Sequence, residues 1–359
     1  MKNYDVTKKE IIFIGIVYIS SFSFLFATSR SGKNDTWICI IISAILTIPT
    51  ILAIHLLFTY PGKNFFEVIE DALGKILGKF SIVMLILLST VVINSTLFEL
   101  IDFIQIVLLF YTPIVVMLFC ILITVYFMLH KSPKVMINFG QFVFMIALLF
   151  FFLSTAFILK NSDFRELLPI AHNNWNSIAI GTLEASASSF SMIIFIPCLF
   201  DHLKDRKKIY KPLGTIVALS LIIILVLAIN NLTVLGATEK SKFYFPKHEL
   251  HRIMGIGTMF QRIEILLSSL FILTEIFKLS LYIYFLLRAL QHLLSLSNYK
   301  VLLIPTLFMA ANNMLSQHRS VLVFIDKESI YTEFMEFAII YLFSFMVIFS
   351  SAFKKLFKT

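Results

Sequence analysis

The stretch Trp37–Thr59 (WICIIISAILTIPTILAIHLLFT) runs for 23 residues without an Asp, Glu, Lys or Arg. A helix needs about 20 mostly apolar residues to cross the hydrocarbon core of a membrane. The same test applied outward along the 359-residue chain finds ten segments of this kind. They are approximately Glu10–Ala27, Trp37–Thr59, Ser81–Leu109, Pro113–His130, Met136–Leu159, Ser177–Phe200, Leu213–Leu235, Glu264–Leu290, Val301–Ser316 and Phe334–Phe353. The sequence therefore predicts an all-α, polytopic integral membrane protein, with about ten transmembrane helices in a single transmembrane domain.

The composition of the whole chain supports the same class of protein. Hydrophobic residues make up 59% and charged residues 14%, and the mean hydropathy is +0.91. A soluble domain has about 45–50% apolar and about 25% charged residues, so an ordinary soluble enzyme, a disordered protein and a disulfide scaffold are excluded. The formal net charge is +9. Because the basic residues lie at the ends of hydrophobic segments, anionic membrane lipid and topology explain this charge better than nucleic acid does.

The distribution of Lys and Arg predicts the orientation of the chain. With the N-terminus inside, the two tails and the even-numbered loops hold 18 of the 30 basic residues, and the odd-numbered loops hold 11. The remaining one, Lys278, lies inside the eighth segment. Both termini are therefore predicted to be cytoplasmic. At the N-terminal end, Thr7 and Glu10 have the spacing of a capping box, which predicts that the first helix begins there.

A short internal repeat suggests where a ligand could bind. The first segment contains Ser20-Ser21-Phe22-Ser23, and the sixth contains Ser188-Ser189-Phe190-Ser191. If residues from about 10 to 159 and from about 177 to 353 form two inverted halves, the two SSFS sequences lie at corresponding positions. Transporters of this design interrupt the first helix of each half near mid-membrane and bind substrate there. Ser20, Ser21, Ser23, Ser188, Ser189 and Ser191 are therefore candidate ligand contacts; the alternative is that a Ser- and Phe-rich chain repeats four letters by chance.

The eighth segment carries Glu275 and Lys278, which lie three residues apart and so share one helix face. An ionisable residue inside a span costs about 2.5–3.5 kcal/mol on insertion scales, so each needs a partner or a role. Lys278 is close to mid-depth, at about 20 Å from either end. We expect the two side chains to pair with each other. The pair then either fixes helix packing or takes part in ion coupling or in binding a ligand carboxylate.

The sixth and third segments carry the other intramembrane polar groups. Glu184 shares a stripe with Ser188 and Ser191, and it is either a site for a ligand ammonium or a proton, or a solvated carboxylate in an outer vestibule. In the third segment, Glu99, Asp102 and Gln105 are spaced by three and must face protein or water. Asp102 and Gln105 are expected near the outer interface. Asn94 and Glu99 are the deeper pair and are candidate ligand-binding residues.

Enzymatic interpretations find little support. The sequence Lys247-His248-Glu249-Leu250-His251 has its histidines three apart, so it is not the H-E-x-x-H zinc motif. There is no phosphate-binding P-loop and no G-x-S-x-G nucleophile motif. We therefore expect no catalytic residues, no metal site and no cofactor.

The chain resembles the B subunit of the spore nutrient-germinant receptors, which belongs to the spore germination protein family within the amino acid–polyamine–organocation superfamily. The resemblance covers essentially the whole chain, and its motifs are dispersed. They are Val6–Glu10 (VTKKE), Asn34–Ile38 (NDTWI), Tyr60–Lys63 (YPGK), Leu73–Gly78 (LGKILG), Tyr111–Pro113 (YTP), Glu166–Ile170 (ELLPI) and Phe260–Glu264 (FQRIE). In one respect the chain departs from the family, which is expected to have a glycine-rich break in the first span. Here that span has only Gly15 and reads SSFS in its middle.

This resemblance implies a ten-helix inverted-repeat fold with a ligand pocket between helices one, three, six and eight. It also implies a receptor subunit in the inner spore membrane that senses a small nutrient, typically an amino acid, alongside an A subunit and a lipoprotein C subunit. Two alternatives stay open. The chain could be a stand-alone amino-acid transporter coupled to protons through Glu184 or Glu275, because the same fold serves alternating access. It could also be mainly an assembly scaffold with a vestigial pocket.

Overall fold

The computed structural model describes residues 6–60, 64–170, 174–203, 209–240, 242–253, 263–317 and 328–356. Within these ranges the chain is all-α, and the only pairing of extended backbone is an isolated bridge between Val6 and Leu203. Of the motifs that carry the family resemblance, residues 61–63 of YPGK and residues 260–262 of FQRIE lie outside the described ranges. The first part of the chain forms α1 (Lys8–Ser20), η1 (Phe22–Phe24), η2 (Lys33–Asp35), α2 (Thr36–Leu46), α3 (Ile48–Leu57), α4 (Phe65–Leu73), α5 (Lys75–Phe103), η3 (Ile104–Leu108), α6 (Ile114–Lys131), α7 (Pro133–Ile158), η4 (Leu159–Asn161) and η5 (Phe164–Leu167).

The second part of the chain begins with a helix that is interrupted once. Its elements are α8 (Trp175–Ser188), η6 (Phe190–His202), α9 (Tyr210–Lys240), α10 (Pro246–Ile253), α11 (Ile263–Leu293), η7 (Tyr299–Leu302), α12 (Leu303–Gln317) and α14 (Glu328–Leu356). The chain is thus a multi-pass membrane protein. Within the described residues, eight helical stretches are long and apolar enough to cross a membrane. The remaining two predicted segments are shorter, because α1 has 13 residues and α12 has 15.

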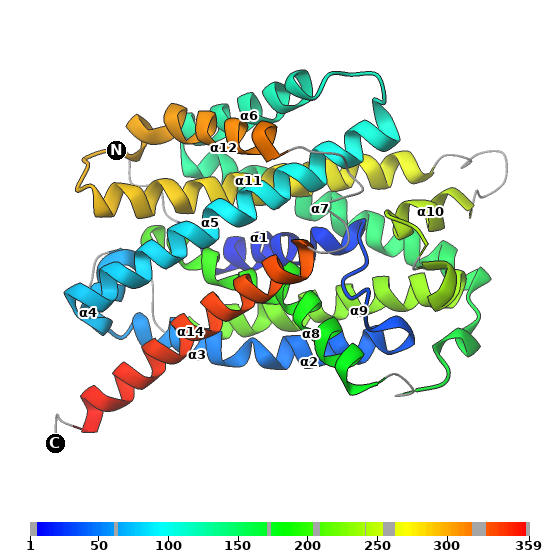
Figure 1. The fold of residues 1–359 in the computed structure, drawn as a ribbon, viewed down its shortest axis with the longest axis horizontal. Helices are drawn as coiled ribbons and strands as arrows, with labels where there is room; N and C mark the ends of the chain where they lie inside the picture. Colours follow the sequence, from blue (N-terminus) through cyan, green and yellow to red (C-terminus); the bar gives the residue numbers. More distant parts are fainter. Residues whose placement is uncertain are drawn as a thin grey trace.

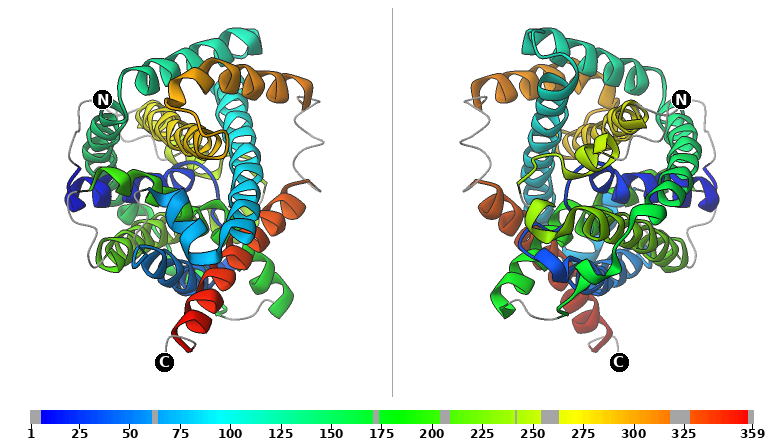
Figure 2. Two further views of the ribbon diagram at one scale, coloured as in Figure 1. Left: turned by 90° about the vertical axis from the view of Figure 1, so that its left-hand side faces the viewer. Right: turned by 90° about the vertical axis from the view of Figure 1, so that its right-hand side faces the viewer.

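The helices run back and forth along the long axis of the molecule (Figure 1). The C-terminal end of α14 and the helix α4 lie at one end of this axis, and α10 lies at the other; α1 begins on the α4 side and runs toward α10. The end-on views in Figure 2 place α6 and α12 along one edge and α2, α3 and the end of α14 toward the opposite edge. The predicted relation between two inverted halves stays a prediction.

Burial separates central helices from lipid-facing ones. In the most apolar stretch of each span, 83% of the residues are buried in Trp175–His202 and in Glu264–Leu293, against 39–44% in the other six. A helix that is buried all round must place its polar groups against protein, whereas a half-buried helix turns its apolar side to lipid. The α8–η6 stretch and α11 therefore form the centre of the molecule, and their polar residues meet other helices.

Local sequence explains several of these boundaries. The Thr7 side chain accepts the N–H of Glu10, and the Glu10 carboxylate accepts the N–H of Thr7, which confirms the predicted capping box. The predicted second span is divided into α2 and α3 next to Pro49, because proline cannot donate the helical hydrogen bond. Gly74 separates α4 from α5 with φ of 84°, a conformation that side chains with a Cβ rarely adopt.

Candidate functional site

Two helices, α1 and the sixth predicted span, are interrupted where the two SSFS sequences lie. The first helix ends at Ser20, and the chain then follows two 3-10 turns, η1 and η2, and irregular backbone until α2 begins at Thr36. The sixth span changes from α-helix to 3-10 helix after Ser188, and Ser189 has non-helical backbone angles (φ −136°, ψ −74°). The two breaks belong to neighbouring elements, since the Tyr18 hydroxyl donates to the Met192 carbonyl oxygen at 3.1 Å. We call residues 21–35 the unwound segment.

Most of the serines predicted to contact a ligand bond to protein groups instead. The hydroxyl of Ser20 donates to the Ile16 carbonyl oxygen and that of Ser21 to the Tyr18 carbonyl oxygen. Ser23 pairs with Thr28, and Ser191 pairs with Ser186. Such bonds satisfy backbone and side-chain groups at a helix break.

Ser188 and Ser189 differ from the other serines. Their hydroxyl oxygens are buried and have no hydrogen-bond partner within the described residues. Of the six serines in the two SSFS sequences, Ser188 is the one that lines the cavity between the two breaks.

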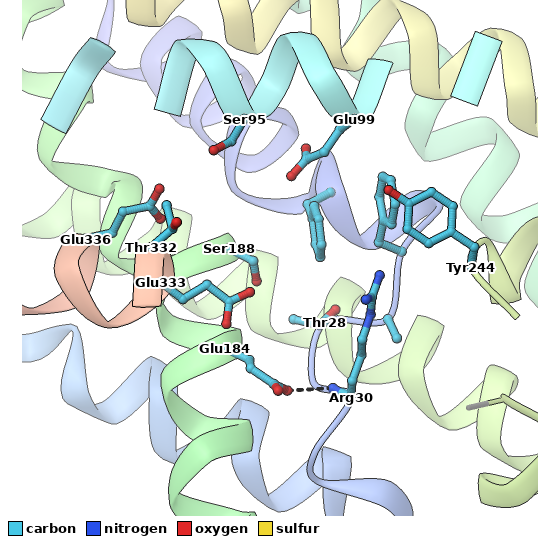
Figure 3. A pocket seen from close by; sticks show the side chains of 13 residues that line it. Thr28, Arg30, Ser95, Glu99, Glu184, Ser188, Tyr244, Thr332, Glu333 and Glu336 are labelled. Atoms are coloured by element: carbon cyan, nitrogen blue, oxygen red, sulfur yellow. Dashed lines mark hydrogen bonds between the residues drawn. The ribbon is translucent and has the colours of Figure 1, made fainter. Parts of the chain in front are cut away.

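This central cavity has a volume of about 140 Å³ and lies between the unwound segment, α5, α8, α14 and the residues that precede α10. Its wall carries one guanidinium and four carboxyl groups, from Arg30, Glu99, Glu184, Glu333 and Glu336 (Figure 3). Neutral polar side chains complete the wall, namely Thr28, Ser95, Ser188, Tyr244 and Thr332. A cavity this polar in the middle of a membrane protein is a binding-site candidate, because charges there need a partner or a role.

Glu184 fastens the unwound segment to α8. Its Oε2 accepts the backbone N–H groups of Arg30 at 2.7 Å and Ser31 at 3.0 Å, and its Oε1 accepts the Ser31 hydroxyl at 2.5 Å. The residue is only 9% exposed. The structure thus differs from the interpretation of Glu184 as a solvated carboxylate in an outer vestibule, because the turn at residues 30–31 folds over the carboxylate and replaces water as its donor.

The same turn packs closely on α8 at Gly181. A Cβ built on Gly181 would lie 2.4 Å from the Ser29 hydroxyl oxygen and 2.8 Å from the Gly32 backbone nitrogen. Replacing Gly181 with Ala should therefore destabilise the protein by about 1–3 kcal/mol, as overpacking does. The measurement is thermal unfolding of the purified protein. Gly214→Ala is the matched control, since a Cβ there meets nothing within 4 Å. Equal midpoints for the two variants would contradict the close approach.

Glu275 and Lys278 form the expected pair, and a third residue joins them. The Lys278 Nζ lies 3.2 Å from Glu275 Oε2 on the same helix and 3.8 Å from Glu99 Oε2 on α5. It also lies 5.7 Å from the centroid of the Phe22 ring in the unwound segment. Glu275 is fully buried and Lys278 is 5% exposed. Lys278 therefore links α11 to α5 and to the break in α1, and it connects the buried pair to a carboxylate of the cavity.

The other polar residues of the third predicted span lie elsewhere. Asn94 lines a separate cavity of about 10 Å³ with Thr306 and Asn313 of α12, which has room for about one water. Asp102, expected near the outer interface, is 4% exposed and accepts the Tyr244 hydroxyl at 3.4 Å. Of the pair Asn94 and Glu99, the structure brings only Glu99 to the central cavity.

Two lysines from the end of α9 and from α10 hold the unwound segment from the other side. The Lys240 Nζ donates to the Ser29 carbonyl oxygen at 3.3 Å and to the Thr36 hydroxyl at 3.0 Å, and the Lys247 Nζ donates to the Ser23 carbonyl oxygen. Both lysines are buried, although the sequence suggested ordinary loop charges. Burial lowers the pKa of Lys247 well below its usual range. These bonds supply donors to carbonyl groups that left the helix.

The histidines of the KHELH sequence take part in this packing. His251 Nε2 hydrogen-bonds the Ser154 hydroxyl at 2.7 Å, and its Nδ1 lies 2.6 Å from the Lys247 carbonyl oxygen. Within the described residues there is no group of three or more His, Cys, Asp or Glu side chains that could hold a metal ion.

Burial lowers the pKa of His251 to about 4, whereas an unfolded histidine has a pKa of about 6.5. Between these two pH values the unfolded chain therefore binds more protons than the folded one. The free energy of unfolding that comes from burying neutral His251 is fully present above about pH 6.5, and it falls as the pH drops toward 4. We expect the loss to reach about 2 kcal/mol at pH 5 and about 3 kcal/mol near pH 4. Thermal unfolding at pH 7.5 and pH 5 measures it, and the drop in midpoint should be smaller in His251→Gln. An equal drop in both proteins would contradict the assignment.

Three charged residues of the cavity were not predicted from the sequence. Glu333 and Glu336 lie at the start of α14, where Glu333 falls just before the predicted last span. Their spacing of three residues was the available signal, since it places both on one helix face. The sequence places Arg30 in the connection between the first and second predicted spans. Its guanidinium lies 5.7 Å from the centroid of the Tyr244 ring.

Comparison with known proteins gives one family. A family model described as spore germination protein matches residues 5–321. This chain belongs to the spore germination protein family. No curated protein matches it. Within this spore germination protein, the matched region includes Arg30, Glu99 and Glu184 and ends before α14, which carries Glu333 and Glu336.

Proposed function

We propose that this spore germination protein is the membrane subunit of a nutrient-germinant receptor. It binds a small nutrient, an amino acid, in the central cavity and passes a conformational change to an A subunit and a C subunit. The observation that carries the proposal is the charged cavity at the two helix breaks, which is lined by a guanidinium and by carboxyl groups. Family membership supports the link to germination. The proposed location is the inner spore membrane, with both termini cytoplasmic.

The charges of the cavity suit a molecule that carries both signs. Figure 3 shows Arg30 and Tyr244 on one side of the cavity and Glu333 and Glu336 on the opposite side. A free amino acid has a carboxylate and an ammonium group, which fit these two sides. The cavity of about 140 Å³ is close in size to a cavity of about 150 Å³ that holds one benzene molecule, so it suits a single small molecule and not a peptide.

The unwound segment supplies a route from ligand to conformation. It is held by Glu184 on one side and by Lys240 and Lys247 on the other. Because Arg30 belongs both to the turn bound by Glu184 and to the cavity wall, a ligand on its guanidinium acts on the same segment. A ligand shifts a conformational equilibrium by the difference in its affinity for the two states.

A second candidate function is a stand-alone amino-acid transporter coupled to protons. The network of Glu275, Lys278 and Glu99 favours it, because the buried carboxyl group of Glu275 and the half-buried one of Glu99 share one ammonium beside the cavity. Under this candidate, Glu275→Gln abolishes proton-coupled uptake. If uptake survives both this change and Glu184→Gln, neither residue couples uptake to protons.

The deciding experiment deletes the gene for this chain in its own spore-former, then follows nutrient-triggered germination and vegetative amino-acid uptake in parallel. Lost germination with intact uptake supports the receptor subunit. Lost uptake with normal germination supports the transporter and removes the argument for partner subunits. If the chain is a scaffold with a vestigial pocket, its deletion abolishes germination. A variant whose cavity no longer binds any amino acid then restores germination.

A further inference from the structure

The charges around the central cavity are unequally satisfied by the protein. Glu184 accepts three hydrogen bonds, and Glu99 is paired with Lys278. Within the described residues, by contrast, Glu333 and Glu336 have neither a hydrogen bond nor an ion pair, although Glu336 is only 6% exposed. The cavity therefore contains two carboxyl groups, one turn apart on α14, that no described cation approaches within ion-pair distance.

A second cavity adjoins the first and has the opposite character. It has a volume of about 200 Å³ and shares Ala27, Arg30 and Tyr244 with the central cavity. Three further basic residues line it, namely Lys33, Lys240 and Lys242. The guanidinium of Arg30 lies where the basic and the acidic cavities meet. Apart from its position over the Tyr244 ring, it has no ion pair or hydrogen bond within the part of the chain that the structure describes.

We propose that the ligand of the central cavity is an amino acid with a cationic side chain. Its carboxylate binds Arg30 at the basic side, and its two cationic groups bind Glu333 and Glu336 at the acidic side. This inference rests on the proposed function and names the ligand class of the same site. An amino acid of this class carries one carboxylate and two cationic groups. These match the guanidinium of Arg30 and the carboxylates of Glu333 and Glu336.

The other classes of amino acid leave a buried charge unmatched. A neutral amino acid offsets Arg30 and one of the two carboxylates, so the other stays buried without a counter-charge, which is unfavourable. An acidic amino acid adds another carboxylate beside Glu333 and Glu336. A diamine without a carboxylate leaves the guanidinium of Arg30 unmatched. Charge complementarity of this kind discriminates ligands mainly through the penalty on the wrong ones.

The test measures binding of L-lysine, L-leucine and L-glutamate to the full-length chain in lipid nanodiscs by calorimetry. We expect L-lysine to bind at least tenfold more tightly than L-leucine, and L-glutamate not to bind. Glu333→Gln and Glu336→Gln should each weaken L-lysine binding at least tenfold and thereby reduce its advantage over L-leucine. Glu239→Gln is the matched control, because this exposed carboxylate pairs with Lys242 outside the central cavity.

The carboxylate end has its own comparison. L-lysinamide, which lacks the carboxylate, should bind the wild type at least tenfold more weakly than L-lysine, and Arg30→Gln should remove that difference. If L-leucine binds the wild type as tightly as L-lysine, the ligand class is wrong while the amino-acid site stands. If no amino acid binds, the proposed function and this inference both fall. Unfolding midpoints of the Gln variants show whether each is folded. If Glu336→Gln does not fold, Glu333→Gln, at the less buried position, still tests the proposal.

Discussion

Replacing Lys278 with methionine should destabilise the protein by about 3–5 kcal/mol, the largest stability effect that we expect from a single substitution. Lys278 is the ammonium between Glu275, at 3.2 Å, and Glu99, at 3.8 Å. Methionine fills similar space but has no charge, so it leaves the fully buried carboxyl group of Glu275 without its cation. The measurement is the unfolding midpoint of the purified protein in detergent or nanodiscs.

Two comparisons make this result specific. Lys242→Met removes an ammonium from an exposed ion pair with Glu239 at 2.5 Å, and exposed pairs contribute about 0–1 kcal/mol. Adding Glu275→Gln to Lys278→Met should recover part of the loss, because it removes the carboxylate left unpaired. If Lys278→Met unfolds at the same midpoint as Lys242→Met, the network does not hold α11 and α5 together.

Replacing Glu184 with glutamine should weaken ligand binding at least tenfold and reduce germination in response to the nutrient. The carboxylate accepts two backbone N–H groups and one hydroxyl from residues 30–31, and hydrogen bonds to a charged group contribute about 1.5–3 kcal/mol each. The amide nitrogen of glutamine cannot accept an N–H, so at least one donor of the turn loses its partner. The guanidinium of Arg30 then loses its fixed position at the cavity.

Binding calorimetry and a germination assay measure this effect. Glu239→Gln serves as control, because it removes the charge of a carboxylate outside the cavity. Wild-type affinity in Glu184→Gln would show that the turn at residues 30–31 does not shape the site. A variant with normal binding and lost uptake would instead favour the proton-coupled transporter.

The sequence predicted the features that depend on neighbours along the chain. The all-α membrane class follows from the length and hydropathy of segments such as Trp37–Thr59. The capping box at Thr7 and Glu10 and the pairing of Glu275 with Lys278 follow from spacings of three residues, which place two side chains on one face of a helix. The two SSFS sequences predicted the two positions where helices break, at Ser20 and Ser188.

The same reasoning placed some groups wrongly or not at all. Asp102 is buried and accepts the Tyr244 hydroxyl, because residues before α10 fold over the end of α5. The first and ninth predicted spans contain helices of 13 and 15 residues, so the count of ten spans stays a prediction. Glu333 and Glu336 escaped notice, since a carboxyl group at the start of an apolar helix normally faces the interface.

What the sequence by itself determined is the set of helices, their breaks and their polar faces, because these depend on hydrogen bonds and spacings within a few residues. Only the tertiary structure decided which polar faces meet. It brought Arg30, Glu184 and Glu333, which are far apart in the sequence, to one cavity. It also placed Lys247 on the carbonyl oxygen of Ser23, 224 residues away. The physical reason is that helix packing in a membrane depends on the fit between whole surfaces, which no local pattern encodes.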